Sequence, residues 1–181
     1  MVIILILLAV AVTFAIGGLL GAPYVPIRRR DSGQLLDLAG LKPGQTLVDL
    51  GSGDGQLLRL AAARGIRGIG YEINPIMVLV SRLVCWRYRR LVKIHLADLW
   101  RSQLPPADAV YVFLMPRFME RLDQKLTAEI KQPTWVISYV FEIPGRQPVR
   151  RGAGSLIYEY CSEPEPQREH FKSEGNLKNV S

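Results

Sequence analysis

Hydrophobic and polar positions divide the chain into three stretches of different character. Residues 2–20 are almost wholly aliphatic, and no charged side chain occurs before Arg28. Between residues 46 and 160, short apolar runs alternate with segments whose apolar residues recur every three or four positions. This alternation predicts strands followed by amphipathic helices. From Glu163 onward the chain is polar and contains Pro164 and Pro166, so we expect a disordered tail.

The alternating region predicts an open α/β sheet. We expect strands at residues 46–50, 68–72, 92–96, 109–114, 134–141 and 156–160. We expect helices at residues 55–65, 74–88 and 117–130, and a short helix before the first strand that Ser32 can cap. Asn74 followed by Pro75 is a favourable start for the helix of residues 74–88. The apolar residues of that helix recur at helical spacing: Ile76, Leu79, Val80, Leu83 and Val84. Because strands and helices alternate, we predict a largely parallel, doubly wound sheet.

The N-terminal apolar run has the length needed to cross roughly 30 Å of hydrocarbon, and we predict an uncleaved membrane anchor. Arg28, Arg29 and Arg30 follow it at once, and arginines beside a membrane span stay on the cytoplasmic side. We therefore expect the rest of the chain on the cytoplasmic or matrix side. A secretory signal peptide would instead carry basic residues before the run and a small-x-small cleavage site after it. A helix buried in the domain is the alternative, which the absence of a polar face disfavours.

These boundaries predict the following segments along the chain. We expect a transmembrane anchor at residues 1–22, a basic linker with a short helix at 23–45, an α/β domain at 46–161 and a polar tail at 162–181. The two cysteines and two histidines show no spacing typical of a disulfide framework or a metal site, so we assign no metal.

The net charge is +7, and a basic cluster lies at Arg87, Arg89 and Arg90, with Trp86 and Tyr88 between them. Such a cluster could contact the phosphates of a nucleic acid. Beside a membrane anchor it is more simply attracted to anionic lipid. A solvated helix end is the remaining interpretation.

A glycine-rich turn is the strongest candidate for chemistry. Residues 46–55 read TLVDLGSGDG, in which an apolar run reaches Asp49 and then Gly51, Gly53 and Gly55 follow at alternate positions. Glycine permits unusual backbone dihedrals and lets a ligand lie against the main chain. The helix that follows directs its N-terminal amides at whatever enters the turn. The segment therefore resembles a nucleotide-binding loop, although a purely structural turn would also account for the glycines.

Two acidic residues follow strands that we expect to end at the same edge of the sheet. Glu72 ends the second strand and Asp98 follows the third. Ligands of open parallel sheets bind beyond the carboxyl ends of the strands, and a carboxylate at Glu72 suits the hydroxyls of a ribose. Each acid alone could be a solvated loop residue. A dinucleotide-binding loop would have a small residue where Gln56 stands, so the pattern favours S-adenosylmethionine over a nicotinamide cofactor.

The segments VDLGSGDG, GYEINP, ADLW and MPRFMERLDQKL occur in this order along the chain. Together they resemble the small membrane-associated protein-lysine methyltransferases that modify the adenine nucleotide translocase and the ATP synthase c subunit, and their prokaryotic relatives. The likeness covers about residues 23–160. It implies a Rossmann-like class I methyltransferase domain that uses S-adenosyl-L-methionine.

The resemblance also implies which residues form the cofactor site. Around the methionine portion it places Asp49, Gly51, Ser52, Gly53 and Gly55. It places Glu72 at the ribose, Asn74 beside it, and Asp98 with Leu99 at the edge of the adenine. Residues 114–116 would form the wall between the cofactor and the acceptor.

The implied reaction is the attack of a lysine amine on the sulfonium methyl. Such a reaction needs alignment and exclusion of water more than a dedicated base, because desolvation lowers the pKa of the lysine. Glu142, after the fifth strand, is the one acid near the expected acceptor side and a candidate for substrate contact. The Asn/Asp-Pro-Pro-aromatic motif of enzymes that methylate nucleobase amines does not follow the fourth strand, and we expect no nucleic-acid partner.

The leading hypothesis is a membrane-anchored methyltransferase acting on lysine of a membrane protein, with the lipid bilayer as a second partner. One alternative is methylation of a lipid or another small hydrophobic molecule. Another is a membrane scaffold that has kept the methyltransferase fold without turnover.

Overall fold

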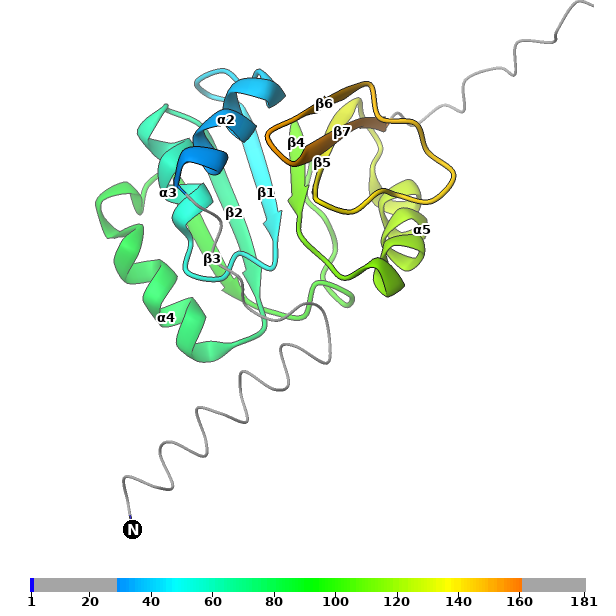
Figure 1. The fold of residues 1–181 in the computed structure, drawn as a ribbon. Helices are drawn as coiled ribbons and strands as arrows, with labels where there is room; N and C mark the ends of the chain where they lie inside the picture. Colours follow the sequence, from blue (N-terminus) through cyan, green and yellow to red (C-terminus); the bar gives the residue numbers. More distant parts are fainter. Residues whose placement is uncertain (2–28, 161–181) are drawn as a thin grey trace, which may run out of the picture.

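A single seven-stranded sheet forms the centre of the molecule, in the order β3-β2-β1-β4-β5-β7-β6 (Figure 1). The computed structural model describes residues 29–160 and Met1. Apart from Met1, the anchor predicted at residues 1–22 lies outside the described residues, and so does the tail predicted at 162–181. The strands are β1 (Thr46–Leu50), β2 (Arg67–Glu72), β3 (Val92–Leu96), β4 (Ala109–Val112), β5 (Thr134–Tyr139), β6 (Arg150–Gly152) and β7 (Ser155–Tyr160). The strands from β1 to β5 pair in parallel, and β7 is antiparallel to both β5 and β6. The prediction of a mostly parallel α/β sheet is therefore confirmed.

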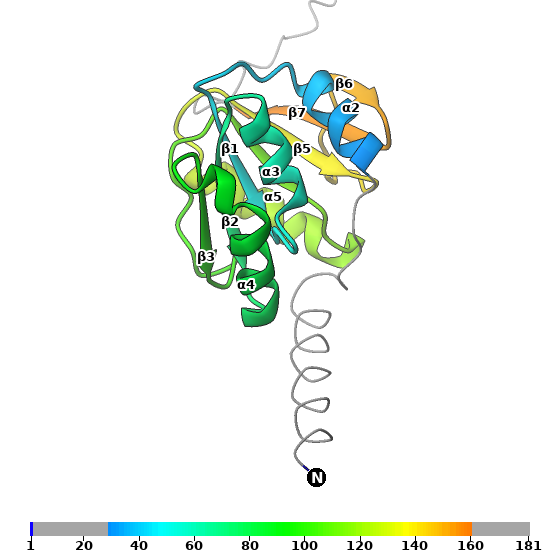
Figure 2. The ribbon, with the colours of Figure 1, turned by 90° about the vertical axis from the view of Figure 1, so that its left-hand side faces the viewer.

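Helices cover both faces of this sheet, as Figures 1 and 2 show. The α-helices are α2 (Arg29–Ala39), α3 (Gln56–Ala63), α4 (Pro75–Val84) and α5 (Met119–Glu129), and short 3-10 helices lie at η1 (Trp86–Tyr88) and η2 (Pro116–Phe118). One hydrophobic cluster joins α2, α3 and α4 to the sheet, and a second joins α5 to the opposite face. Leu47 belongs to the first cluster and its neighbour Val48 to the second, because successive side chains of a strand point to opposite faces. Both faces of β1 are thus buried, which explains why Leu47 and Val48 are both apolar instead of alternating with polar residues.

Most predicted elements are present, and the differences lie at their ends. Ser32 does not cap the first helix, because residues 29–31 are already helical and Ser32 is buried inside α2. The helix predicted at residues 74–88 ends as an α-helix at Val84, and η1 continues the chain. The strand β6 is an addition to the predicted elements. Ala153 and Gly154 both have positive φ, the geometry of a tight hairpin turn, and this turn folds β6 back onto β7.

The apolar residues of α4 do not all face the core. Val78 is buried, whereas Leu79 and Leu83 are exposed to solvent. Among residues 29–160, no helix combines the length and the apolar character needed to span a bilayer.

Candidate functional site

The glycine loop of residues 51–55 connects β1 to α3 at the carboxyl edge of the sheet. Gly51, Gly53 and Gly55 have φ values of 95°, 52° and 75°, which residues with a Cβ rarely adopt. The backbone N–H groups of Gly51 and Ser52 both donate to the carbonyl of Tyr71, at 2.9 and 3.0 Å, and so attach the loop to the end of β2. At Gly55 a Cβ would also lie 2.8 Å from the Cβ of Ser81 on α4. Glycine at this position therefore allows α3 and α4 to pack closely.

Glu72 at the end of β2 is joined to the same loop by its side chain. Its Oε2 accepts a hydrogen bond from the N–H of Gly53 at 2.9 Å, and its Oε1 accepts one from the N–H of Asn74 at 2.8 Å. A carboxylate has about four acceptor positions, so each oxygen of Glu72 can accept one more donor. The loop and the acid are thus held in a fixed relation 19 residues apart in sequence.

Asn74 has a structural role in this arrangement. Its Oδ1 accepts hydrogen bonds from the N–H groups of Ile76 and Met77, at 2.9 and 3.4 Å, so Asn74 is the N-cap of α4. The side chain is buried. The start of α4 is therefore fixed directly beside Glu72.

Asp98 lies at the same edge of the sheet, one strand further along. The N–H of Ala97 donates to the carbonyl of Glu72 at 2.9 Å, which extends the pairing of β2 and β3 to the residue before Asp98. The Oδ1 of Asp98 accepts from the N–H of Trp100 at 2.9 Å, and Leu99 is partly buried on the α5 side of the sheet. The structure thus brings Glu72, Asn74, Asp98, Leu99 and the glycine loop to one edge. Whether they bind a cofactor stays a prediction.

A group of buried oxygen atoms without hydrogen-bond partners lies beneath the loop. Within the described part of the chain, these atoms include Oδ1 of Asp49, Oγ of Ser52 and the hydroxyl of Tyr111. Asp49 and Tyr111 are register partners on β1 and β4. Burial, and then the nearby charges of Glu72 and Asp54, raise the pKa of Asp49 to about 8. Burial, and then the charge of Asp49, also raise the pKa of Tyr111.

Unpartnered buried oxygens are costly, and a carboxyl group with a raised pKa is neutral at pH 7 unless a cation approaches it. The arrangement therefore suits a ligand that carries a positively charged hydrogen-bond donor. Sequence reasoning missed Tyr111, since its neighbour Asp49 is distant in sequence and only the pairing of β1 with β4 brings the two together.

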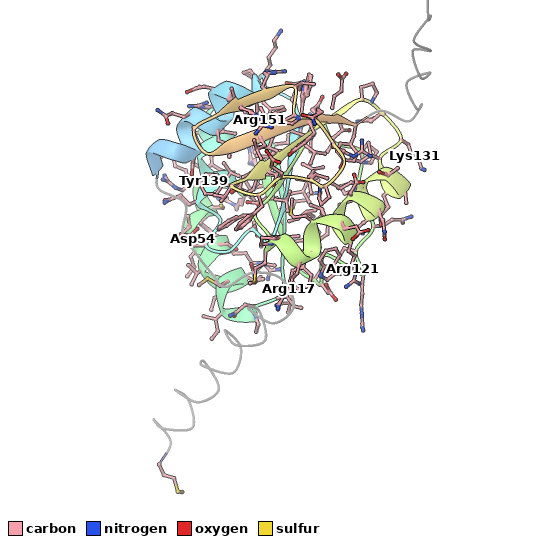
Figure 3. The ribbon with its side chains drawn as sticks, turned by 45° about the vertical axis from the view of Figure 1, so that its right-hand side comes forward. Asp54, Arg117, Arg121, Lys131, Tyr139 and Arg151 are labelled. Atoms are coloured by element: carbon pink, nitrogen blue, oxygen red, sulfur yellow. The ribbon has the colours of Figure 1, made fainter. Side chains whose placement is uncertain are left out.

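Glu142, the predicted candidate for substrate contact, lies away from this group. Its carboxylate forms an ion pair with Arg151 of β6 at 2.8 Å, and 64% of the Glu142 side chain is exposed. In Figure 3, Arg151 lies well apart from Asp54, which belongs to the glycine loop. Residues 114–116 do follow β4 at the carboxyl edge, where Leu114 is buried and Pro116 begins η2.

The position of the loop is the usual ligand site of an open α/β sheet. The strand order reverses between β1 and β4, and ligands bind beyond the strand ends at such a point. The structure is similar to the crystal structure of an RNA methyltransferase from Salinibacter ruber in complex with S-adenosyl-L-homocysteine, with 30% identity and a TM-score of 0.70 over 78% of this chain and 98% of that one. The fold and the loop together define a Rossmann-like methyltransferase domain.

The family follows from the sequence of this domain. The profile described as the ANTKMT methyltransferase domain matches residues 49–150, and the chain belongs to this family. It is 39% identical to the adenine nucleotide translocase lysine N-methyltransferase of Mus musculus over 133 residues, which are 72% of this chain and 58% of that protein. It is 34% identical to the Xenopus laevis lysine N-methyltransferase of the ATP synthase c subunit over 146 residues, 78% of this chain and 64% of that protein. The family resemblance seen in the sequence is confirmed, and the chain spans less than two thirds of these two relatives.

Proposed function

We propose that this protein is an S-adenosylmethionine-dependent methyltransferase that modifies lysine of a membrane protein. The observation that carries the proposal is the buried Oδ1 of Asp49, which has no hydrogen-bond partner, beneath a glycine loop whose backbone is bound by Glu72. The names of the two lysine N-methyltransferase relatives support the acceptor class.

The residues present fit the cofactor at two charged points. The ammonium group of its methionine portion would supply the donor that Asp49 and Ser52 lack, and it would favour the ionised form of Asp49. The free acceptor positions of Glu72 would receive the ribose hydroxyls, with Asp98 and Leu99 at the adenine. The backbone N–H groups of Gly53 and Asn74 hold the Glu72 carboxylate in place before any ligand arrives.

When bound, the cofactor supplies an electrophilic methyl group on a sulfonium. The work left to the chain is to orient the acceptor amine and to exclude water from it. An apolar surrounding disfavours the protonated form of a lysine and so leaves a nucleophilic amine. Leu114 after β4 is buried, and it would form part of the wall where such an amine enters.

The chain would act at a membrane surface. The apolar run of residues 2–20 and the arginines at positions 28–30 support an anchor with the domain on the cytoplasmic or matrix side. Confinement to a bilayer raises the effective concentration of the domain near membrane-embedded acceptors.

Transfer of labelled methyl groups tests the proposal. The full chain is incubated with tritium-methyl S-adenosylmethionine and vesicles containing adenine nucleotide translocase or the ATP synthase c subunit, and the protein is then hydrolysed. We expect label in methylated lysine with the wild type and with Glu120→Ala, an exposed position on α5. We expect little label with Glu72→Ala.

Parallel samples contain vesicle lipid alone or unmodified RNA as the acceptor. The RNA sample is included because the similar Salinibacter ruber structure is named an RNA methyltransferase. Label found only in the organic extract or only in RNA would overturn the lysine proposal, and so would equal labelling by Glu72→Ala.

A further inference from the structure

The outer face of α4 and η1 is apolar although it faces solvent. Leu79, Leu83 and Trp86 are 61%, 66% and 63% exposed, and they follow one another at spacings of four and three residues. This spacing places them in one stripe along the helix. Leu96, at the end of the adjacent edge strand β3, is also exposed. We call these four side chains the outer face of α4.

The inner face of α4 already has its packing partners. Val78, Ser81 and Cys85 are buried, and the Sγ of Cys85 lies 3.5 Å from the carbonyl oxygen of Gly55 at the start of α3. The helix therefore has two apolar stripes, of which the domain uses one. In Figure 2 α4 lies at the front of the molecule, and no other element of residues 29–160 covers its outer side.

The segment that carries the outer face has only basic charges, and the acids Glu72 and Asp98 lie just outside its two ends. Residues 73–97 contain no Asp or Glu but five basic residues, Arg82, Arg87, Arg89, Arg90 and Lys93. The guanidinium of Arg89 lies 5.0 Å from the centre of the Trp86 ring, so a cation sits directly beside the apolar stripe. The guanidinium of Arg82 donates a hydrogen bond to the carbonyl of Ile94 on the edge strand β3 at 2.9 Å.

We propose that the outer face of α4 docks onto the surface of an anionic lipid bilayer. Leucine and tryptophan side chains on a helix flanked by arginines match the boundary between acyl chains and negatively charged headgroups. A second copy of the chain fits less well, because a symmetric contact would bring together two faces of the same positive charge with no acid within either segment to balance it. RNA would meet the arginines but would leave Leu79 and Leu83 without apolar partners.

The docked orientation has a consequence for the acceptor. Asn74 begins α4, and its N–H is bound by the carboxylate of Glu72, so the outer face and the site share one rigid element. Docking would hold the carboxyl edge of the sheet beside the bilayer. The inference rests on the membrane location proposed above. In this orientation the acceptors would be lysines at the membrane–water interface.

Site-directed spin labelling tests this docking with the full chain. A nitroxide is attached at Leu83→Cys, or at Gln124→Cys as a matched exposed position on α5, in a Cys161→Ser background where the remaining Cys85 is buried. Each protein is reconstituted in phosphatidylcholine vesicles with or without phosphatidylglycerol. Collision of the label with dissolved oxygen and with an aqueous nickel chelate is then measured.

We expect the oxygen-to-nickel collision ratio at position 83 to rise several-fold when phosphatidylglycerol is present. The ratio at position 124 should keep the value of a label in water. Adding Arg87→Gln, Arg89→Gln and Arg90→Gln should remove most of that rise. A position 83 label that stays as aqueous as position 124 overturns the inference. Immobilisation of the label in lipid-free detergent overturns it in favour of a second copy, and immobilisation that requires RNA overturns it in favour of a nucleic acid.

Flotation and cofactor titration of the same samples separate this proposal from the preceding one. If the chain floats with vesicles and binds S-adenosylhomocysteine while position 83 stays aqueous, only the docking face is wrong. If the chain does not float, the membrane location and the docking face are both wrong.

Discussion

Asp49 is an acidic residue buried in the interior of the domain. Burial of its carboxyl group, and then the nearby charges of Glu72 and Asp54, raise its pKa to about 8. An unfolded chain would ionise the same group near pH 4. Between these values the folded state binds more protons than the unfolded state, so this group's contribution to stability falls as the pH rises.

The first prediction concerns the proton on Asp49. A cofactor that brings an ammonium group to Asp49 should ionise it, so binding near pH 6.5 should release about one proton per chain. Calorimetric titration with S-adenosylhomocysteine in two buffers of different ionisation enthalpy measures this number. Asp49→Asn should bind with no such release, and release by that variant equal to the wild type would contradict the assignment.

The second prediction concerns stability without the cofactor. Because Asn mimics the neutral form of Asp49, the melting temperature of Asp49→Asn should fall less than that of the wild type between pH 5 and pH 8. Differential scanning fluorimetry across this range checks the sign. A wild type that becomes more stable relative to the variant as the pH rises would show that Asp49 is ionised in the free protein.

Two local sequence motifs position the elements of the site. One is the glycine loop before α3, and the other is the Asn74-Pro75 start of α4. Both are formed by neighbouring residues, so local reasoning predicts them. The ion pair of Glu142 with Arg151, the proximity of Tyr111 to Asp49 and the outward direction of Leu79 depend on how distant segments pack. The sequence of α4 has apolar residues on two sides of the helix, and this pattern alone does not predict which side is buried.

The third prediction concerns the close packing of α3 and α4. In Gly55→Ala the new Cβ would lie 2.8 Å from the Cβ of Ser81 and would keep a φ of 75°, so we expect a loss of about 3 kcal/mol in the free energy of unfolding. Gly44→Ala has a similar φ of 88° with no atom within 4 Å, and it should lose only about 1 kcal/mol. Urea denaturation measures both. Equal losses would mean that the contact with Ser81 does not matter.

The fourth prediction separates the two roles considered for Asn74. If Asn74 acts as the N-cap of α4, Asn74→Ala should lower the free energy of unfolding by about 1 kcal/mol, and Asn74→Ser should recover most of it. The affinity for S-adenosylhomocysteine should change much less than in Glu72→Ala. A large loss of affinity with unchanged stability would assign Asn74 to the ligand instead.

At the scale of the whole molecule, one edge of the sheet holds the loop, the acids and the start of α4 together. The strand order, with its reversal between β1 and β4, places these groups in one site although they are spread from residue 49 to residue 99. Glu72 is the member that contacts both the loop and α4. If this site binds the cofactor, replacing Glu72 should weaken cofactor affinity more than replacing any other residue of the site.

The most direct measurement is therefore calorimetric titration of the full chain with S-adenosylhomocysteine, beside Glu72→Ala and the exposed control Glu120→Ala, each checked to be folded. One binding site per chain is expected for the wild type and the control. In Glu72→Ala the affinity should weaken about tenfold or more, since the two charge-assisted hydrogen bonds proposed between the carboxylate and the ribose hydroxyls are lost. No binding by the folded wild type, or equal affinity in Glu72→Ala, would contradict the proposed site.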